Sequence, residues 1–146
     1  MTEVLIKRLS KNIELPKYET KGSSGMDLSA NIEMQKKIEP GETSIIPTGI
    51  SVSIPKNFEI QIRSRSGLAA KSQISVLNSP GTIDADYRGE LKVILINLGN
   101  KTFVVERGSR IAQMVLCPVV KAKFKEVDSL DDTDRGASGF GSTGLK

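Results

Sequence analysis

The densest group of side chains that could do chemistry lies in the stretch LNSPGTIDADYRG (residues 77–89). Asp84 carries a carboxylate that can take a proton from water, and Tyr87 offers a flat face against which a ring can pack. Asn78 supplies an amide that donates and accepts hydrogen bonds, as recognition of a nucleobase edge requires. Asp84 and Asp86 stand two residues apart, so in an extended chain they would share one face, and either could enter a site. A β-turn is the alternative interpretation, but a turn alone does not explain why Asp84 and Tyr87 are present.

A second stretch, RSRSGLAAK (residues 63–71), combines two Arg and two Ser with a Gly where a helix can begin. Hydroxyls, guanidinium groups and backbone N–H donors of this kind suit a phosphate group. The alternative is an ordinary helix N-cap by Ser66.

Two polar residues interrupt otherwise apolar strand patterns. Asp27 lies within GMDLSA (residues 25–30), and Gln113 lies within RGSRIAQMVL (residues 107–116). Asp27 is either a turn or surface residue, or it holds a hydrated cation. A buried glutamine needs partners, so Gln113 either ties down backbone or holds a water molecule.

The chain ends in RGASGFGSTG (residues 135–144) and two further residues. Its GFGSTG formally matches the G-x-G-x-x-G dinucleotide pattern, but that pattern requires a strand before it and a helix after it. A glycine-rich backbone with Ser142 and Thr143 can still wrap an anion, and Arg135 adds a guanidinium. Phe140 has no local core to join. A disordered tail without a binding role is the alternative.

Short strands must position these residues. Alternation in FEIQIR (58–63) predicts a half-buried strand, and further β-rich segments lie at residues 3–9, 25–30, 43–54, 90–97, 101–106 and 110–120. The turn-like LGN predicts a hairpin between residues 90–97 and 101–106. One or two helical turns are expected around residues 66–73. The pattern predicts an all-β sandwich or barrel, followed by a flexible arm over residues 128–146.

Composition narrows the function. The 146 residues favour one domain, and 21 Lys and Arg against 17 Asp and Glu give a net charge of +4. The positive residues are scattered and aromatic residues are scarce, which does not favour nucleic-acid binding. One cysteine and no histidine suit a reducing compartment and remove the commonest general base and metal ligand. Without a long apolar segment near the N-terminus we expect a cytoplasmic protein that does not span a membrane.

Five segments, in order, resemble the five motifs of trimeric deoxyuridine triphosphatases (dUTPases): GMDLSA, RSGLA, GTIDADYRG, RIAQM and RGASGFGSTG. The resemblance covers roughly residues 22–144. It implies a distorted jelly-roll-like β-barrel in residues 1–127, a homotrimer with active sites between subunits, and an arm over residues 128–146 that closes over an active site. It also implies Mg²⁺-assisted hydrolysis of dUTP to dUMP and pyrophosphate by water attack on the α-phosphorus. This reaction keeps uracil out of DNA and supplies dUMP for dTMP synthesis.

The resemblance assigns roles by position. Asp84 would activate the attacking water, Gln113 would hold it, and Ser66 would stabilise charge on the leaving pyrophosphate. Tyr87 would pack under the deoxyribose, and Asp27 would bind Mg²⁺ through a water molecule. The remaining substrate-binding positions are Arg65 and Gly67 at the phosphates; Asn78, Gly81 and Thr82 near uracil; and Arg135, Phe140, Gly141, Ser142 and Thr143 in the arm.

Ser64 departs from the family, which usually has Pro before RSGLA. Two rival functions remain open. A dCTP deaminase shares the fold but needs a glutamate beside the pyrimidine, and Glu90 is the only acid near that stretch beyond its aspartates. A trimeric β-barrel that only binds nucleotide or a protein partner would not need Asp84, Tyr87 and Gln113.

Overall fold

The structure is a computed structural model that describes residues 2–139. The predicted site residues Phe140, Gly141, Ser142 and Thr143 therefore lie outside the described residues. Between residues 2 and 139 the chain forms eleven strands and one short helix. This result confirms the prediction of an all-β protein.

The first half of the chain, up to the helix, contributes β1 (Leu5–Arg8), β2 (Met26–Ser29), β3 (Lys36–Ile38), β4 (Thr43–Pro47), β5 (Ile50–Ser53) and β6 (Phe58–Arg63). The helix α1 (Ser66–Ser72) follows, close to its expected position. The second half contributes β7 (Ile74–Val76), β8 (Gly81–Ile83), β9 (Lys92–Asn97), β10 (Phe103–Val105) and β11 (Arg110–Pro118). The strands β3, β7 and β8 were not expected, because three residues are too few to show an alternating pattern.

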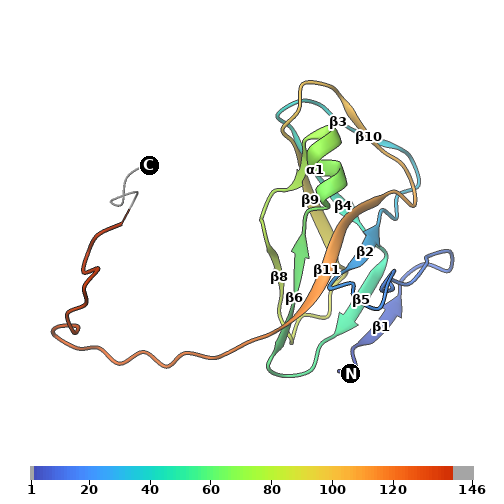
Figure 1. The fold of residues 1–146 in the computed structure, drawn as a ribbon. Coiled ribbons are helices and arrows are strands. Elements are labelled where there is room, and N and C mark those ends of the chain that lie inside the picture. The colour runs from blue at the N-terminus through green and yellow to red at the C-terminus, as the bar shows by residue number, and fades with distance from the viewer. Residues whose placement is uncertain (1, 140–146) are drawn as a thin grey trace.

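The strands of the described chain form four antiparallel sheets (Figure 1). The largest has the order β2-β11-β6-β8, and a second has the order β4-β9-β7. Two smaller sheets pair β1 with β5 and β3 with β10. None of the four closes on itself in these pairings. The four-stranded sheet matters most here, because the predicted site segments lie on it or directly after its strands.

The predicted hairpin between residues 90–97 and 101–106 is wrong. The strand β10 pairs with β3, whereas β9 lies between β4 and β7. Asn97, the last residue of β9, is fully buried. Its Nδ2 donates to the carbonyls of Ile38 and Lys101, both at 2.8 Å, and its Oδ1 accepts from the Gly99 amide at 2.9 Å. These bonds fasten the end of β9 to β3, so the chain leaves its sheet instead of turning back along it.

The core lies on one face of each larger sheet. Ile60 and Ile62 of β6 and Met114 of β11 point inward, as do Val93 and Leu95 of β9. Burial of each such side chain contributes about 1.5–3 kcal/mol. Because strand side chains alternate, the opposite face of the four-stranded sheet carries Asp27, Gln113 and their neighbours. The inward residues thus fix which polar residues face outward.

The chain after β11 contains no strand or helix as far as residue 139, the last one described. It runs away from the sheets (Figure 1). Its large apolar side chains are exposed, most of all Val120 and Phe124, each at 95%. Among the described residues, no helix has the length and apolar character needed to cross a membrane.

Candidate active site

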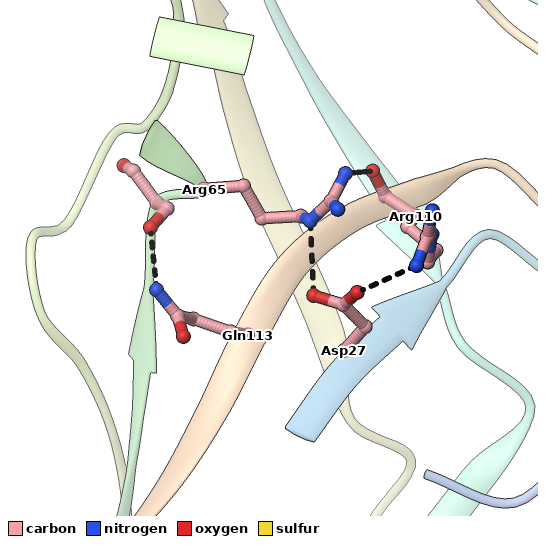
Figure 2. Close-up of polar contacts among 5 residues, drawn as sticks. Asp27, Arg65, Arg110 and Gln113 are labelled. Atoms are coloured by element: carbon pink, nitrogen blue, oxygen red, sulfur yellow. Dashed lines mark hydrogen bonds and ion pairs between the residues drawn. The ribbon is translucent and has the colours of Figure 1, made fainter. Parts of the chain in front are cut away.

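A first group of site residues gathers where β2 and β11 run side by side. Pairing of Gln113 with Asp27 in the antiparallel register places both side chains on the outward face. The Arg65 Nε donates to Asp27 Oδ1 at 2.9 Å, and the Arg110 Nη1 donates to Asp27 Oδ2 at 3.3 Å (Figure 2). The Arg65 Nη1 also donates to the Arg110 carbonyl at 3.1 Å. Asp27 is therefore not a solitary surface acid, because it holds two guanidinium groups in place.

Gln113 ties down backbone, one of the two roles that its place in an apolar strand suggested. Its Nε2 donates to the Ser64 carbonyl at 3.1 Å (Figure 2). Its Oε1 lies close against Gly25, where an added Cβ would stand only 2.6 Å from that oxygen. Gly25 directly precedes β2. Because it has no side chain, it leaves room for the Gln113 amide, whose oxygen stays available as an acceptor.

Ser66 and Gly67 form the first turn of α1. The N-cap residue is Arg65, whose side chain makes no capping bond, so the alternative of an N-cap by Ser66 is wrong. The Ser66 side chain is exposed, and a Cβ added at Gly67 would meet nothing within 4 Å. Both positions are consequently open to a ligand, next to the guanidinium group of Arg65.

A second group of site residues surrounds β8. A Cβ added at Gly81 would lie 3.1 Å from the Cβ of Ile62 and 3.3 Å from the Asn78 Nδ2. Gly81 therefore packs its backbone against β6 and brings the Asn78 amide beside it. Thr82, the next residue of β8, is exposed. The structure thus brings together the three residues that were predicted near a base.

Asp84 begins a tight turn instead of an extended segment. The Tyr87 amide donates to the Asp84 carbonyl at 3.1 Å, so the expectation of an extended chain through Asp84 and Asp86 is wrong. The Arg88 Nη1 donates to the carbonyls of Ala85 and Tyr87 at 2.7 and 2.9 Å. The turn is therefore held together by its own side chain.

Tyr87 is fixed by the residues that follow it. Its hydroxyl donates to the Glu90 carbonyl at 3.0 Å, and its ring packs so closely over Gly89 that an added Cβ would stand 2.3 Å from the hydroxyl oxygen. The Glu90 carboxylate accepts from the Gly49 amide at 2.9 Å. Asp84 and Tyr87 line a hollow of about 260 Å³, together with Thr82, Ile83, Glu90 and Lys92.

One chain does not bring Asp84 to the first group. The strand β8 runs antiparallel to β6, with Ile83 opposite Ile60, so Asp84 lies near the start of β6, whereas Arg65 follows its end. Gln113 pairs with Arg63 of β6, so about four strand positions, or about 13 Å, separate Asp84 from Gln113 along the sheet. No hydrogen bond or ion pair joins the two groups within the described chain. The sequence assigned Asp84 and Gln113 to one water molecule, and a single chain separates them.

Arg135 also stays apart from both groups. Its Nε donates to the Ser138 carbonyl at 2.9 Å, within its own segment. Two contributors to the first group were absent from the sequence prediction, namely Arg110 and the carbonyl of Ser64. Its place on the same strand as Gln113, three residues earlier, was the signal available for Arg110, whereas a backbone carbonyl leaves no signal in a sequence.

The donor set limits how a metal ion could bind. No cluster of three acidic or cysteine side chains occurs in the part of the chain that the structure describes. Asp27 presents one carboxylate, with each oxygen accepting a single bond from an arginine. Because Mg²⁺ commonly binds through one or two carboxylates together with substrate phosphates and water, these residues fit an ion that arrives with a phosphorylated ligand.

The fold and the site define an all-β protein in which the cluster of Asp27, Arg65, Arg110 and Gln113 lies apart from the turn that carries Asp84 and Tyr87. The dUTPase family matches residues 11–144. The deoxyuridine 5'-triphosphate nucleotidohydrolase of Rickettsia bellii is 56% identical over 146 residues, covering 99% of this chain and 97% of the relative. The enzyme of the same name from Fusobacterium nucleatum is 51% identical and covers 99% of both.

Solved structures agree with the sequence relatives. The Staphylococcus bacteriophage 80alpha dUTPase with dUPNHPP has a TM-score of 0.85 and 29% identity, covering 99% of this chain and 100% of that one. The same phage dUTPase without a named ligand has a TM-score of 0.80 and 26% identity, covering 89% and 99%. The chain belongs to the dUTPase family. This finding confirms the family inferred from the five motifs.

Proposed function

We propose that the protein hydrolyses dUTP to dUMP and pyrophosphate, by attack of water on the α-phosphorus. The observation that carries the proposal is that a chain matching the dUTPase family over residues 11–144 presents both parts such a reaction requires. One part is the group around Asp27, Arg65 and Gln113, and the other is the turn that carries Asp84 and Tyr87. The reaction would keep uracil out of DNA and supply dUMP for dTMP synthesis, in the cytoplasm.

The turn after β8 would bind the nucleoside. The Asn78 amide and the backbone at Gly81 and Thr82 offer donors and acceptors for the uracil edge. A site built to hydrogen-bond its substrate can reject an analogue that lacks those groups by about 10⁴–10⁵. The Tyr87 ring, held by Gly89 and the Glu90 carbonyl, would leave no room for a ribose 2′-hydroxyl.

The arginine-lined group would bind the triphosphate. Arg65 supplies charge, the exposed Ser66 hydroxyl and the open backbone at Gly67 supply donors, and charge developing on pyrophosphate is stabilised by such groups. Mg²⁺, carried by the phosphates and reached by Asp27 through water, would supply further charge neutralisation. In the arm, Arg135, Ser142 and Thr143 would contact the γ-phosphate, and Phe140 and Gly141 would cover the uracil.

Catalysis would depend on one carboxylate, that of Asp84, and one carboxamide, that of Gln113. Asp84 would accept the proton of the attacking water, since its exposed carboxylate has no partner among the described residues. Gln113 would orient that water through Oε1 while Nε2 stays bonded to Ser64. General-base catalysis of this kind contributes about 10²–10⁴-fold to the rate.

The separation of Asp84 from Gln113 supports a shared site. If both contact one water, they come from different chains, because about four strand positions, or about 13 Å along the sheet, separate them within one chain. We therefore infer a homotrimer of jelly-roll-like barrels, formed by residues 1–127, in which neighbouring subunits complete each active site. Residues 128–146 would form an arm that closes over one of these sites.

A comparison of substrates tests the proposal. Pyrophosphate release should be fast with dUTP and Mg²⁺, and much slower with dCTP, dTTP and UTP. The Asp84→Asn variant should lose at least about 100-fold in kcat, and equal rates in both proteins would remove Asp84 from its role. Release of ammonia from dCTP would instead support a deaminase. The Glu90 carboxylate, which that chemistry would need, is already bonded to the Gly49 amide.

A further inference from the structure

Ser64 is hydrogen-bonded to Gln113 of the first group and to Val76, which lies two residues before Asn78 of the second group. Its carbonyl accepts from the Gln113 Nε2 at 3.1 Å. Its hydroxyl accepts from the Val76 amide at 2.9 Å. Val76 ends β7, two residues before Asn78. A side chain that the family resemblance left without a role therefore lies between the water-orienting amide and the base-recognition loop.

The hydroxyls around Val76 form a closed set of bonds. The Ser64 and Ser75 hydroxyl oxygens lie 2.9 Å apart, and the Ser75 hydroxyl donates to the Val76 carbonyl at 3.3 Å. Since Ser75 uses its only proton there, Ser64 donates to Ser75. The Ser79 hydroxyl donates to the same Val76 carbonyl. Both backbone polar groups of Val76, its N–H and its C=O, are thus bound by serine side chains.

This arrangement meets a need that the sheet leaves open. On its other side β7 pairs with β9, where the Leu77 amide donates to the Ile94 carbonyl at 2.8 Å. The Val76 amide points away from β9, and Val76 is only 2% exposed. Without Ser64 this buried N–H would lack its partner, and backbone donors in that situation tend to move until they find another one.

We propose that Ser64 is a positioning residue for dUTP hydrolysis, which sets the Asn78 loop through Val76 while its carbonyl sets the Gln113 amide. The inference rests on the proposed function of the site. Ser64 does not contact the reacting atoms itself. Its hydroxyl fixes the position from which Asn78 recognises the base. Loss of this hydroxyl should therefore change substrate selection by more than the accompanying loss of global stability can account for.

The test compares Ser64→Ala, Ser64→Thr and Ser44→Ala with the wild-type protein. Thr keeps a hydroxyl at position 64. Ser44 is an equally small, buried serine in β4, and no hydrogen bond between described side chains uses it, so its variant is a matched control. For each protein, kcat and KM are measured for dUTP and dCTP, together with the Kd of a non-hydrolysable dUTP analogue and the thermal midpoint.

We expect Ser64→Ala to raise KM for dUTP and Kd for the analogue about tenfold, and to lower the preference for dUTP over dCTP about tenfold. That ratio corresponds to one misplaced hydrogen bond. Ser64→Thr should restore both values to within about twofold, and Ser44→Ala should match the wild type. All assays are run well below the thermal midpoint of each variant. The proposal is overturned if Ser64→Ala lowers the midpoint but leaves KM, Kd and the preference for dUTP over dCTP unchanged.

A second variant covers the case in which Ser64→Ala does not fold. Ser79→Ala removes a hydroxyl from the carbonyl side of Val76 and leaves the Val76 amide bonded to Ser64, so it should lower the dUTP preference in the same direction. An unchanged preference in Ser79→Ala would then count against the proposal. A wild-type protein that does not hydrolyse dUTP would instead refute the proposed function, which keeps the two failures apart.

Discussion

The packing of Tyr87 over Gly89 predicts that one added methyl group changes sugar selection. In Gly89→Ala the new Cβ would stand 2.3 Å from the Tyr87 hydroxyl oxygen, 2.5 Å from Cζ and 3.0 Å from Cε2. Non-bonded heavy atoms prefer about 3.5–4.0 Å. The end of the ring must therefore move by about 1 Å or more. The ring can do so because it is 44% exposed, but it loses the bond to the Glu90 carbonyl.

The expected effect separates specificity from stability. An apolar wall rejects one extra hydroxyl by about 10–200-fold, so a displaced Tyr87 should lower the kcat/KM ratio of dUTP over UTP about tenfold. One partly exposed hydrogen bond contributes at most about 1.5 kcal/mol. The free energy of unfolding should therefore fall by no more than that. Pyrophosphate release measures the first quantity, and urea denaturation measures the second.

The control and the refuting result are both available in this chain. Gly22→Ala adds the same methyl group where no atom lies within 4 Å, and it should leave the ratio and the stability unchanged. Tyr87→Ala should lower the ratio at least as far as Gly89→Ala does. If Gly89→Ala keeps the wild-type ratio while Tyr87→Ala loses it, the reasoning from the close contact is wrong.

Three further predictions concern other parts of the chain. Asn97→Ala should lower the free energy of unfolding by about 3 kcal/mol, measured in urea, because it leaves the buried Ile38 carbonyl and the Gly99 amide without their hydrogen-bond partner. A loss below about 1 kcal/mol would contradict this account. Asp27→Asn should change stability by less than about 1 kcal/mol, since its ion pairs are partly exposed, yet it should reduce kcat/KM for dUTP measurably. Deletion of residues 134–146 should nearly abolish dUTP turnover and leave the thermal midpoint unchanged, because residues 134–139, the described part of that segment, contribute nothing to the core; a large fall in the midpoint would show a structural role.

The sequence predicted those strands in which burial alternates over enough residues. FEIQIR is one such segment, and β6 has the bounds that its alternation indicated. The path after β9 could not be predicted, because LGN resembles a hairpin turn as long as the contacts of Asn97 are unknown. Those contacts reach Ile38, 59 positions away in the chain. Long-range bonds of a buried side chain therefore decided the topology where local turn chemistry suggested another.

The candidate site shows the same division. The identities of Asp27, Arg65 and Gln113 were predicted, but the ion pair between Asp27 and Arg65 joins residues 38 positions apart. The role of Ser64 depends on a backbone amide of another strand, and amides look alike at every position. The turn at Asp84 was missed because the residues Asp-Ala-Asp-Tyr fit extended chain as well as a turn, until Arg88 closes it.

The turn that Arg88 closes has a thermodynamic consequence for the ligand. Fixing the backbone of one residue costs about 1–2 kcal/mol of conformational entropy. The bonds from Arg88 to the carbonyls of Ala85 and Tyr87, and from Tyr87 to Glu90, already hold this segment in the unliganded chain. The entropy is therefore lost when the protein folds, not when the nucleotide binds. Because this segment is already ordered, binding of the sugar loses little conformational entropy, and the contacts with the sugar contribute almost fully to affinity.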